Sequence, residues 1–256
     1  MDKPLLDLYA DSLISSFSYP TATGFSNVLD QARSHDQITR FLAARPFTSA
    51  DFWHLVKPLV RQVESTEGVL IVDDSIEEKP YTDENELITW HCDPSKDRVV
   101  KGINFLTTLY CVEAVSFPVA FELVTKTETV VDKKTGKPRK KSALTKNERY
   151  RTMLQACVRN QIPCRFVLND VWYASAENMK FVKHDLQKDF IMPLKTNRKV
   201  ALSLADKQRG AYVAVETLAL EAGTVREIYL EEVDFPLLLV KHVFTNEDGS
   251  TGVLYL

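Results

Sequence analysis

Three aspartates follow apolar runs that are typical of short buried strands. Asp73 and Asp74 end the run VLIVDD, and Asp170 ends the run CRFVLND. Two such strands that lie side by side in parallel place their carboxylates at one edge of a sheet. Carboxylate oxygens suit Mg²⁺ or Mn²⁺, and two such ions can activate a water or a 3′-hydroxyl and stabilise the leaving oxygen of a phosphodiester. The pattern therefore predicts a metal-dependent phosphoryl-transfer site.

Another interpretation of these acids stays open, because a chain that emerges from a buried strand into solvent often carries acids there. The local charge favours the metal interpretation, since residues 68–125 hold four Lys or Arg against eleven Asp or Glu. Bare carboxylates at this density repel DNA phosphates, so a metal ion must bind before the DNA or together with it. We expect Asn169, Glu77 and Glu78 to be solvated loop residues.

A basic segment follows the acidic one, with ten Lys or Arg against three Asp or Glu in residues 126–151. Gly136 and Pro138 within it predict an exposed hairpin tip or loop. A second basic cluster, KTNRK, follows the strand-like run DFIMPLK. Both clusters suit salt-sensitive, sequence-independent contacts with phosphate, and a solvated loop is the alternative for each. The candidate DNA-binding residues are Lys133, Lys134, Lys137, Arg139, Lys140, Lys141, Lys195, Asn197 and Arg198.

The elements that must position these residues follow a mixed α/β order. Residues 1–66 have helical apolar spacing, and Ser or Thr start signals precede the runs GFSNVLD and QITRFL. We expect Pro46 and Pro58 to limit helix length. From residue 67 the pattern predicts three strands, a helix near 147–160, a strand, a helix near 174–187 and a last strand. From about residue 210 it becomes β-rich.

Composition excludes several classes of protein. The chain of 256 residues is 45% hydrophobic and 26% charged, which is typical of a globular protein. No apolar stretch approaches the roughly 18 residues of a membrane span, so we expect no membrane partner and a cytoplasmic location. The four cysteines form no C-x-x-C pair, the histidines have no HExxH spacing, and Walker A, GxGxxG and GxSxG motifs are absent. The pI near 6.0 does not by itself predict a nucleic-acid partner. We expect Trp172 and Tyr173 to pack in the core, and stacking on bases is the alternative role.

The order of five landmarks resembles that of DDE insertion-sequence transposases, the cut-and-paste kind with an RNase H-like core. The landmarks are SHDQITRFL, VLIVDDS, HCDPSKDRVVKGINFL, FVLNDVWYAS and MPLKTNRKV. The resemblance implies an RNase H-like mixed sheet with flanking helices and a β-rich insertion, occupying residues 67–256 after a small helical domain, 1–66. It also implies that Asp74, which precedes Ser75, and Asp170 are catalytic ligands of Mg²⁺ or Mn²⁺. Asp73 is the fallback for the first position.

The third catalytic carboxylate of such enzymes is a glutamate on a helix beyond the β-rich insertion. Glu231 and Glu232 do not match that motif, and the chain stops in a strand-like run. We therefore expect a chain truncated before the third carboxylate and inactive alone, with a reading frame that continues past Leu256.

The partners implied by the resemblance are double-stranded DNA, specifically transposon terminal repeats, and further copies of the chain in a synaptic complex. It implies a prokaryotic cell, with the protein on the nucleoid when bound to DNA. Arg40, in the helical part, is the candidate for contact with the DNA backbone, and a surface ion pair is the alternative. The first hypothesis is metal-dependent cleavage and strand transfer of DNA at transposon ends. The alternatives are an inactive DNA-binding remnant that competes with or inhibits an intact transposase, and a stand-alone RNase H-like nuclease.

Overall fold

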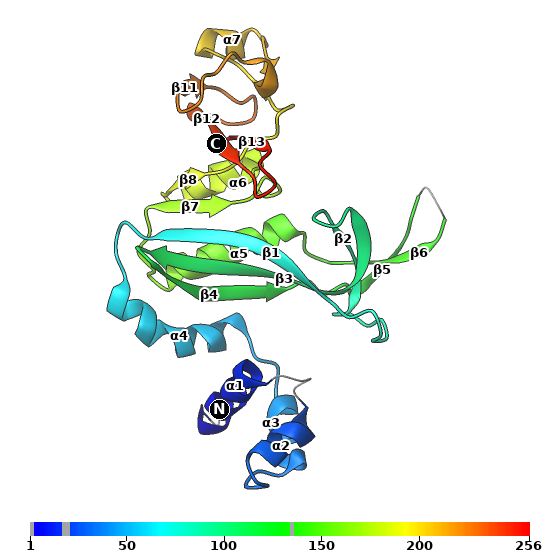
Figure 1. Cartoon of the computed structure of the whole chain (residues 1–256). Coiled ribbons are helices and arrows are strands. Elements are labelled where there is room, and N and C mark those ends of the chain that lie inside the picture. The colour runs from blue at the N-terminus through cyan, green and yellow to red at the C-terminus, as the bar shows by residue number, and fades with distance from the viewer. Residues whose placement is uncertain (1–2, 17–20, 134–135) are drawn as a thin grey trace. The chain divides into compact units, whose positions relative to one another are not determined.

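The chain forms two compact units, Met1–Thr48 and Ser49–Leu256. The computed structural model describes residues 3–16, 21–133 and 136–256, and Figure 1 shows their elements. No helix formed by these residues combines the length and apolar character needed to cross a lipid bilayer.

The first unit contains three helices. They are α1 (Lys3–Ser15), α2 (Ala22–Val28) and α3 (His35–Ala43). Thr21 caps α2 through a hydrogen bond from the Gly24 amide, and Ser34 caps α3 in a capping box with Gln37, which confirms both predicted start signals. Leu5, Phe25 and Ile38, one from each helix, form the buried core of the unit.

Helix α4 (Ser49–Val63) belongs to the second unit, so the units divide at Thr48 and not at the predicted residue 66. The physical reason is that α4 packs on the sheet: the Phe52 and Phe121 rings lie 5.9 Å apart, edge to face. Pro58 lies inside α4, so the expectation that it limits the helix is wrong. Burial of Trp53 and Val60 on either side of Pro58 offsets the missing backbone hydrogen bond.

The second unit is built on a six-stranded mixed sheet, which confirms the predicted mixed α/β class. Strand β3 (Arg98–Val112) lies between β1 (Val69–Glu78) and β4 (Val115–Leu123) and pairs with both in antiparallel orientation. Strands β7 (Phe166–Asn169) and β8 (Asp189–Ile191) continue the sheet beyond β1, in parallel with it. The remaining strand, β2 (Thr89–Asp93), pairs with the beginning of β3.

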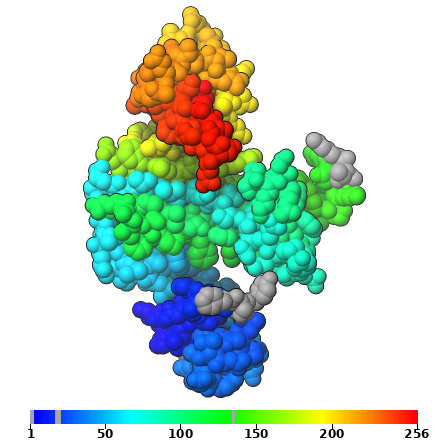
Figure 2. Space-filling model, viewed as in Figure 1, coloured from blue at the N-terminus to red at the C-terminus, as the bar shows by residue number. Residues whose placement is uncertain are grey.

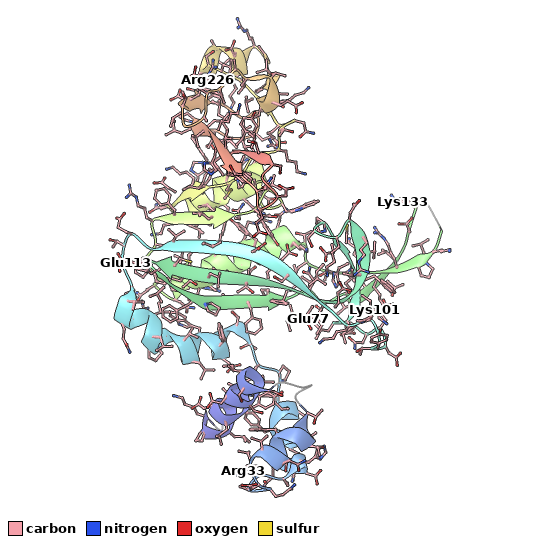
Figure 3. All side chains as sticks on the ribbon, viewed as in Figure 1. Arg33, Glu77, Lys101, Glu113, Lys133 and Arg226 are labelled. Carbon is pink, nitrogen blue, oxygen red and sulfur yellow. The ribbon has the colours of Figure 1, made fainter. Side chains whose placement is uncertain are left out.

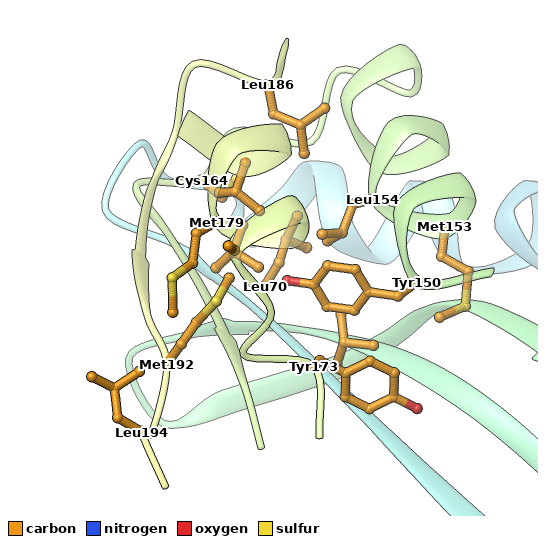
Figure 4. Close-up of a cluster of buried hydrophobic side chains, with 14 of the residues drawn as sticks. Leu70, Tyr150, Met153, Leu154, Cys164, Tyr173, Met179, Leu186, Met192 and Leu194 are labelled. Carbon is orange, nitrogen blue, oxygen red and sulfur yellow. The ribbon is translucent and has the colours of Figure 1, made fainter. Parts of the chain in front are cut away.

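Helices near both predicted positions flank this sheet. They are α5 (Lys146–Arg159) and α6 (Ala176–Lys180), the latter extended by a π-helical turn, Phe181–Asp185. Thr145 and Glu148 form a capping box that fixes the start of α5. The buried face of α5 packs on the sheet, and Figure 4 shows Tyr150, Met153 and Leu154 among the residues of this core.

The basic segment and the C-terminal part contain the remaining elements. Strands β5 (Glu128–Val131) and β6 (Pro138–Lys141) pair as a hairpin. After β8 come β9 (Lys199–Val200), α7 (Leu204–Gln208), β10 (Val213–Ala214), a 3₁₀ turn (Val215–Thr217), β11 (Val225–Ile228), β12 (Leu237–Thr245) and β13 (Thr251–Tyr255). The last three strands form an antiparallel sheet, so the part of the chain after about residue 210 is β-rich, as predicted.

Gly102 allows β1 and β3 to approach each other closely. A Cβ atom at this position would lie 2.3 Å from the backbone oxygen of Glu77. Gly102→Ala is therefore expected to lower the free energy of unfolding by about 1–3 kcal/mol, because a backbone atom cannot move aside as a side chain can. Urea denaturation measures this loss. Lys101→Ala, at the preceding position, is the control and should change stability by less than about 0.5 kcal/mol; equal stability of the two variants would contradict the explanation.

Candidate active site

Strands β1 and β7 bring the three predicted aspartates together. The strands are parallel, with Val72 opposite Asn169, so Asp73 and Asp170 are the next residues along each strand. Asp73, Asp74 and Asp170 line one hollow of about 430 Å³, to which β2 contributes Asp93. The sheet edge thus collects the carboxylates as the parallel arrangement predicts.

The surroundings of these acids differ from the sequence prediction in two respects. Strand β1 does not end at Asp74 but continues through Glu77 and Glu78, because β3 is long enough to pair with it as far as Gly102. Asn169 is buried and its Oδ1 accepts a hydrogen bond of 2.8 Å from the Tyr150 hydroxyl. The expectation is therefore wrong for Asn169, which is buried. Glu77 is exposed, as expected, and Glu78 is half-buried, but both lie in a strand and not in a loop.

Asp74 is held by three side-chain donors from three different elements. Lys146 Nζ lies 2.5 Å from Oδ2, and Asn104 Nδ2 donates to the same oxygen at 3.0 Å. The Tyr173 hydroxyl donates to Oδ1 at 3.0 Å. Burial by itself raises the pKa of Asp74, but the hydrogen bonds and the charge of Lys146 outweigh it and lower the pKa below its ordinary value. Asp74 is therefore an ionised carboxylate in a fixed orientation.

Asp170 has the opposite electrostatic environment. Burial raises its pKa, and the negative charges of Asp73 and Asp74 raise it further, against a 2.8 Å hydrogen bond from the Trp172 amide to Oδ1. Asp73 Oδ1 accepts from the Asp74 amide at 2.8 Å. The hydrogen bond from the Trp172 amide therefore does not fully offset the effect of burial and of the neighbouring negative charges on Asp170.

A divalent cation fits this donor set. The negative charges of Asp73 and Asp74, which add to the effect of burial in raising the pKa of Asp170, are what a bound cation would offset. Asn104 Oδ1 is buried beside Asp74 with no hydrogen-bond partner among the described residues. Within the same part of the chain, no group of three or more His, Cys, Asp or Glu is arranged to hold a metal ion. Asp73, Asp74, Asp93 and Asp170 are the carboxylates that line the hollow, and they include the pair Asp74 and Asp170 expected from the sequence.

The tryptophan and tyrosine after Asp170 have different environments. Tyr173 is buried and stacks on Tyr150 with 5.2 Å between ring centroids, in agreement with the expected core role. Trp172 is 58% exposed, so a core role for it is wrong. Its amide faces Asp170, and its indole is left outside because the chain turns sharply after β7.

The second basic cluster adjoins the hollow of the carboxylates. Lys195, Asn197 and Arg198 line a cleft that also includes Trp172, the residue shared with that hollow. Lys195 Nζ lies 4.9 Å from the centroid of the Trp172 ring. Glu231 and Glu232 line this cleft and not the hollow of the aspartates, and Arg198 lies 3.7 Å from Glu232.

The first basic cluster forms the exposed hairpin β5–β6, as predicted. The candidate residues Lys133, Lys137, Arg139, Lys140 and Lys141 are all exposed. Lys134 lies outside the described residues. The hairpin is therefore placed to present a dense positive charge to a large polyanion.

Arg40 lies in α3, in the first unit. Its side chain is exposed, and its Nε donates to the Asp36 carbonyl at 3.1 Å, which holds the guanidinium along the helix surface.

Lys146 and Asn104 are the site residues that sequence reasoning misses. In the sequence Lys146 stands out only as part of the basic segment, although the capping signal at Thr145 places it at the start of a helix. Its contact with Asp74, 72 positions away in the chain, depends on how α5 docks on β3 and β4, and no local pattern encodes that.

One family of known proteins matches most of the chain. A model of the family described as DDE superfamily endonuclease matches residues 3–211, which include Asp74 and Asp170. No curated protein matches the sequence.

Proposed function

Since the chain belongs to the DDE superfamily endonucleases, transposase-type nucleases that cut DNA, we propose that it cleaves DNA by metal-dependent phosphoryl transfer at Asp74 and Asp170. The observation that carries this proposal is the parallel pairing of β1 with β7, which collects both carboxylates in one hollow. The basic cluster next to the hollow and the exposed basic hairpin β5–β6 suit the phosphates of a DNA substrate.

The topology of the sheet supports an RNase H-like core. In the order β4, β3, β1, β7, β8, strand β1 lies in the centre. On one side β3 is antiparallel to β1 and β4 is antiparallel to β3. On the other side β7 and β8 run parallel to β1. The proposed core begins with β1, and the three-stranded sheet of β11, β12 and β13 is the proposed β-rich insertion.

The residues of the chain have separable tasks in this mechanism. Asp74 and Asp170 would hold a Mg²⁺ or Mn²⁺ ion, with Asp73 as the fallback for Asp74, and that ion would activate a water or hydroxyl and stabilise the leaving oxygen. Tyr173 and Asn104 orient the Asp74 carboxylate, and the Trp172 amide orients Asp170. Lys195, Asn197 and Arg198 bind phosphates next to the hollow.

The finer proposal is a cut-and-paste transposase of an insertion sequence. It cleaves and joins DNA at terminal repeats, acts as a homo-oligomer, and uses the first unit, including Arg40, to bind DNA. A second candidate is a DNA-binding chain that does not cleave and competes with intact transposase. The ammonium of Lys146 against Asp74 favours that candidate, because it neutralises a carboxylate that the metal needs.

Nicking of supercoiled plasmid in Mn²⁺ buffer tests the proposal. Cleavage at the proposed site would give nicks that require the metal, disappear with EDTA, and are lost in the double variant Asp74→Asn, Asp170→Asn, whereas a chain that is inactive alone, as expected from the sequence, would give none. The control is Asp93→Asn, which changes another carboxylate of the same hollow. Nicking that persists in the double variant would contradict the proposed site, and DNA binding without nicking would favour the second candidate.

Lys146→Met is expected to tighten Mn²⁺ binding by about 5-fold, because the metal no longer competes with an ammonium for Asp74. Calorimetric titration at constant ionic strength measures this gain. Lys146→Arg keeps the charge and is the matched control, with no gain expected. Weaker Mn²⁺ binding by Lys146→Met would mean that Lys146 helps to form the site.

A further inference from the structure

A second exposed tryptophan, Trp90, lies on the edge strand β2 and lines a cleft different from the hollow that holds Asp74 and Asp170. Side chains along β2 alternate: Thr89, His91 and Asp93 point inward and are buried. Trp90 points outward and is 52% exposed. A tryptophan at an outward position of an edge strand contributes little to the core, and its indole presents a large flat apolar surface to solvent.

Lysines from two other segments surround this tryptophan. Lys101 is its partner on β3 and is labelled in Figure 3, with Nζ 6.0 Å from the centroid of the indole ring. Lys126 Nζ donates to the Trp90 carbonyl at 2.5 Å, and the Lys126 amide donates to the Glu86 carbonyl at 2.8 Å. The segment before the hairpin is thereby fixed beside β2.

The hairpin β5–β6 and β2 form the walls of one cleft. In the space-filling view the hairpin lies next to the β2 segment (Figure 2). The cleft measures about 710 Å³, and its lining includes Trp90, Lys126, Arg139, Lys140 and Glu84. The lining thus contains three cationic side chains, one carboxylate and the indole of Trp90.

The charge of the cleft is not balanced from within. Burial lowers the pKa of Lys126, and the positive charges of Lys146 and Arg139 lower it further, more than Glu84 compensates. Arg139 lies 3.6 Å from Asp132, a longer separation than a close ion pair. An anion bound between these cations would relieve the repulsion.

We propose that this cleft binds an unpaired nucleotide of DNA, with its base stacked on Trp90 and its phosphate held by Arg139 and Lys140. The proposal rests on the proposed function for the choice of DNA as the polymer. An aromatic surface beside cations is the combination that binds single strands, because every base has a flat face and every linkage a negative charge. Bases inside a duplex stack on each other and do not offer that face, so the cleft selects an unpaired segment.

Tryptophan fluorescence tests this site directly. The chain has three tryptophans: Trp53 is buried, and Trp172→Phe leaves Trp90 as the exposed emitter. We expect oligo(dT) to quench the emission of the Trp172→Phe variant in metal-free buffer, and a duplex of equal length to quench it far less. In the chain with Trp172 intact, Trp90→Ala should weaken oligo(dT) binding by about 5-fold or more in an anisotropy titration, and Trp90→Phe should retain most of the affinity.

The outcomes separate this site from the proposed function. Equal quenching by duplex and single strand, or oligo(dT) binding that Trp90→Ala leaves unchanged, would overturn the stacking site even if plasmid nicking is intact. Quenching by oligo(dT) in a chain that does not nick plasmid would support the stacking site and count against the proposed cleavage. Because Trp90 points outward, thermal unfolding of Trp90→Ala should match that of the unaltered chain, and this excludes misfolding as the cause of weaker binding.

Discussion

Replacing Asp170 by asparagine is expected to weaken Mn²⁺ binding by more than about 100-fold, beyond the range typical for residues that only support a metal ligand. DNA affinity in metal-free buffer should change by less than about 2-fold, because the carboxylate binds the cation and does not contact bases. Calorimetry measures the first quantity and fluorescence anisotropy with labelled duplex the second. The asparagine keeps an oxygen for the Trp172 amide, so the turn after β7 is preserved.

The same substitution should stabilise the metal-free protein at neutral pH. The pKa of Asp170 is raised in the folded chain, by burial and by Asp73 and Asp74, so the folded state binds a proton more readily than the unfolded state. Stability therefore decreases as the pH rises through the window above the ordinary aspartate value, and Asp170→Asn removes that decrease. Its melting temperature should exceed that of the unaltered chain at pH 7 and converge with it in acid.

Asp93→Asn is the matched control for this pH dependence. Asp93 lines the same hollow, but Ser95 donates to it from both its hydroxyl (2.6 Å) and its amide (3.0 Å), which lowers the pKa of Asp93. The ionised form of Asp93 is thus stabilised in the folded state. Asp93→Asn removes this stabilisation and should lower the melting temperature at pH 7. If Asp170→Asn instead lowers both the melting temperature and DNA affinity while Mn²⁺ binding is unchanged, Asp170 is a structural residue and the proposed site is wrong.

The second large effect is expected at the hairpin β5–β6. Alanine at Lys137, Arg139, Lys140 and Lys141 should lower the slope of log affinity for DNA against log salt by up to about 4, at roughly one unit for each phosphate that the hairpin no longer binds. The affinity should fall for all duplex sequences alike, because binding to phosphates carries no sequence information. Anisotropy titrations across a series of salt concentrations measure the slope.

A second quadruple variant controls for net charge. It replaces four cations that each form an ion pair with a carboxylate away from the hairpin: Lys79 with Glu77, Arg165 with Glu67, Lys183 with Asp189, and Arg209 with Asp206. Its total charge equals that of the hairpin variant, but its slope should stay near that of the unaltered chain. Equal slopes for the two variants would mean that the hairpin acts only through bulk charge.

Buried strands were the most predictable part of the site. VLIV and FVLN are continuous apolar runs, and such runs indicate buried strands; in β1 and β7 one face of each run is buried and the other is half-buried. The end of β1 was not predictable in the same way. Glu77 and Glu78 look like loop residues because they are charged, yet β3 reaches far enough to pair with them. Strand length depends on the partner strand, which lies elsewhere in the sequence.

Long-range docking explains the remaining differences. The helical spacing of α4 is visible in the sequence, but its assignment to the second unit depends on Phe121, in β4. Lys146 reaches Asp74 only because α5 packs on β3 and β4, the antiparallel part of the sheet. Trp172 follows a buried strand and is apolar, which predicts burial, but the turn after Asp170 leaves its indole outside. For α4 and Lys146 a partner distant in the sequence decides the environment, and for Trp172 the turn after Asp170 does.

The most direct test of the metal site locates the bound cation on the chain without relying on activity. Fe²⁺ binds oxygen ligands as Mn²⁺ does, and with ascorbate and peroxide it generates radicals that cut the nearest backbone, so mass spectrometry of the fragments maps the site. We expect cuts beside Asp74 and Asp170 that Mn²⁺ suppresses and that the double variant Asp74→Asn, Asp170→Asn does not show. Cuts confined to other segments, or the same cuts in the double variant, would contradict a metal site at the edge formed by β1 and β7.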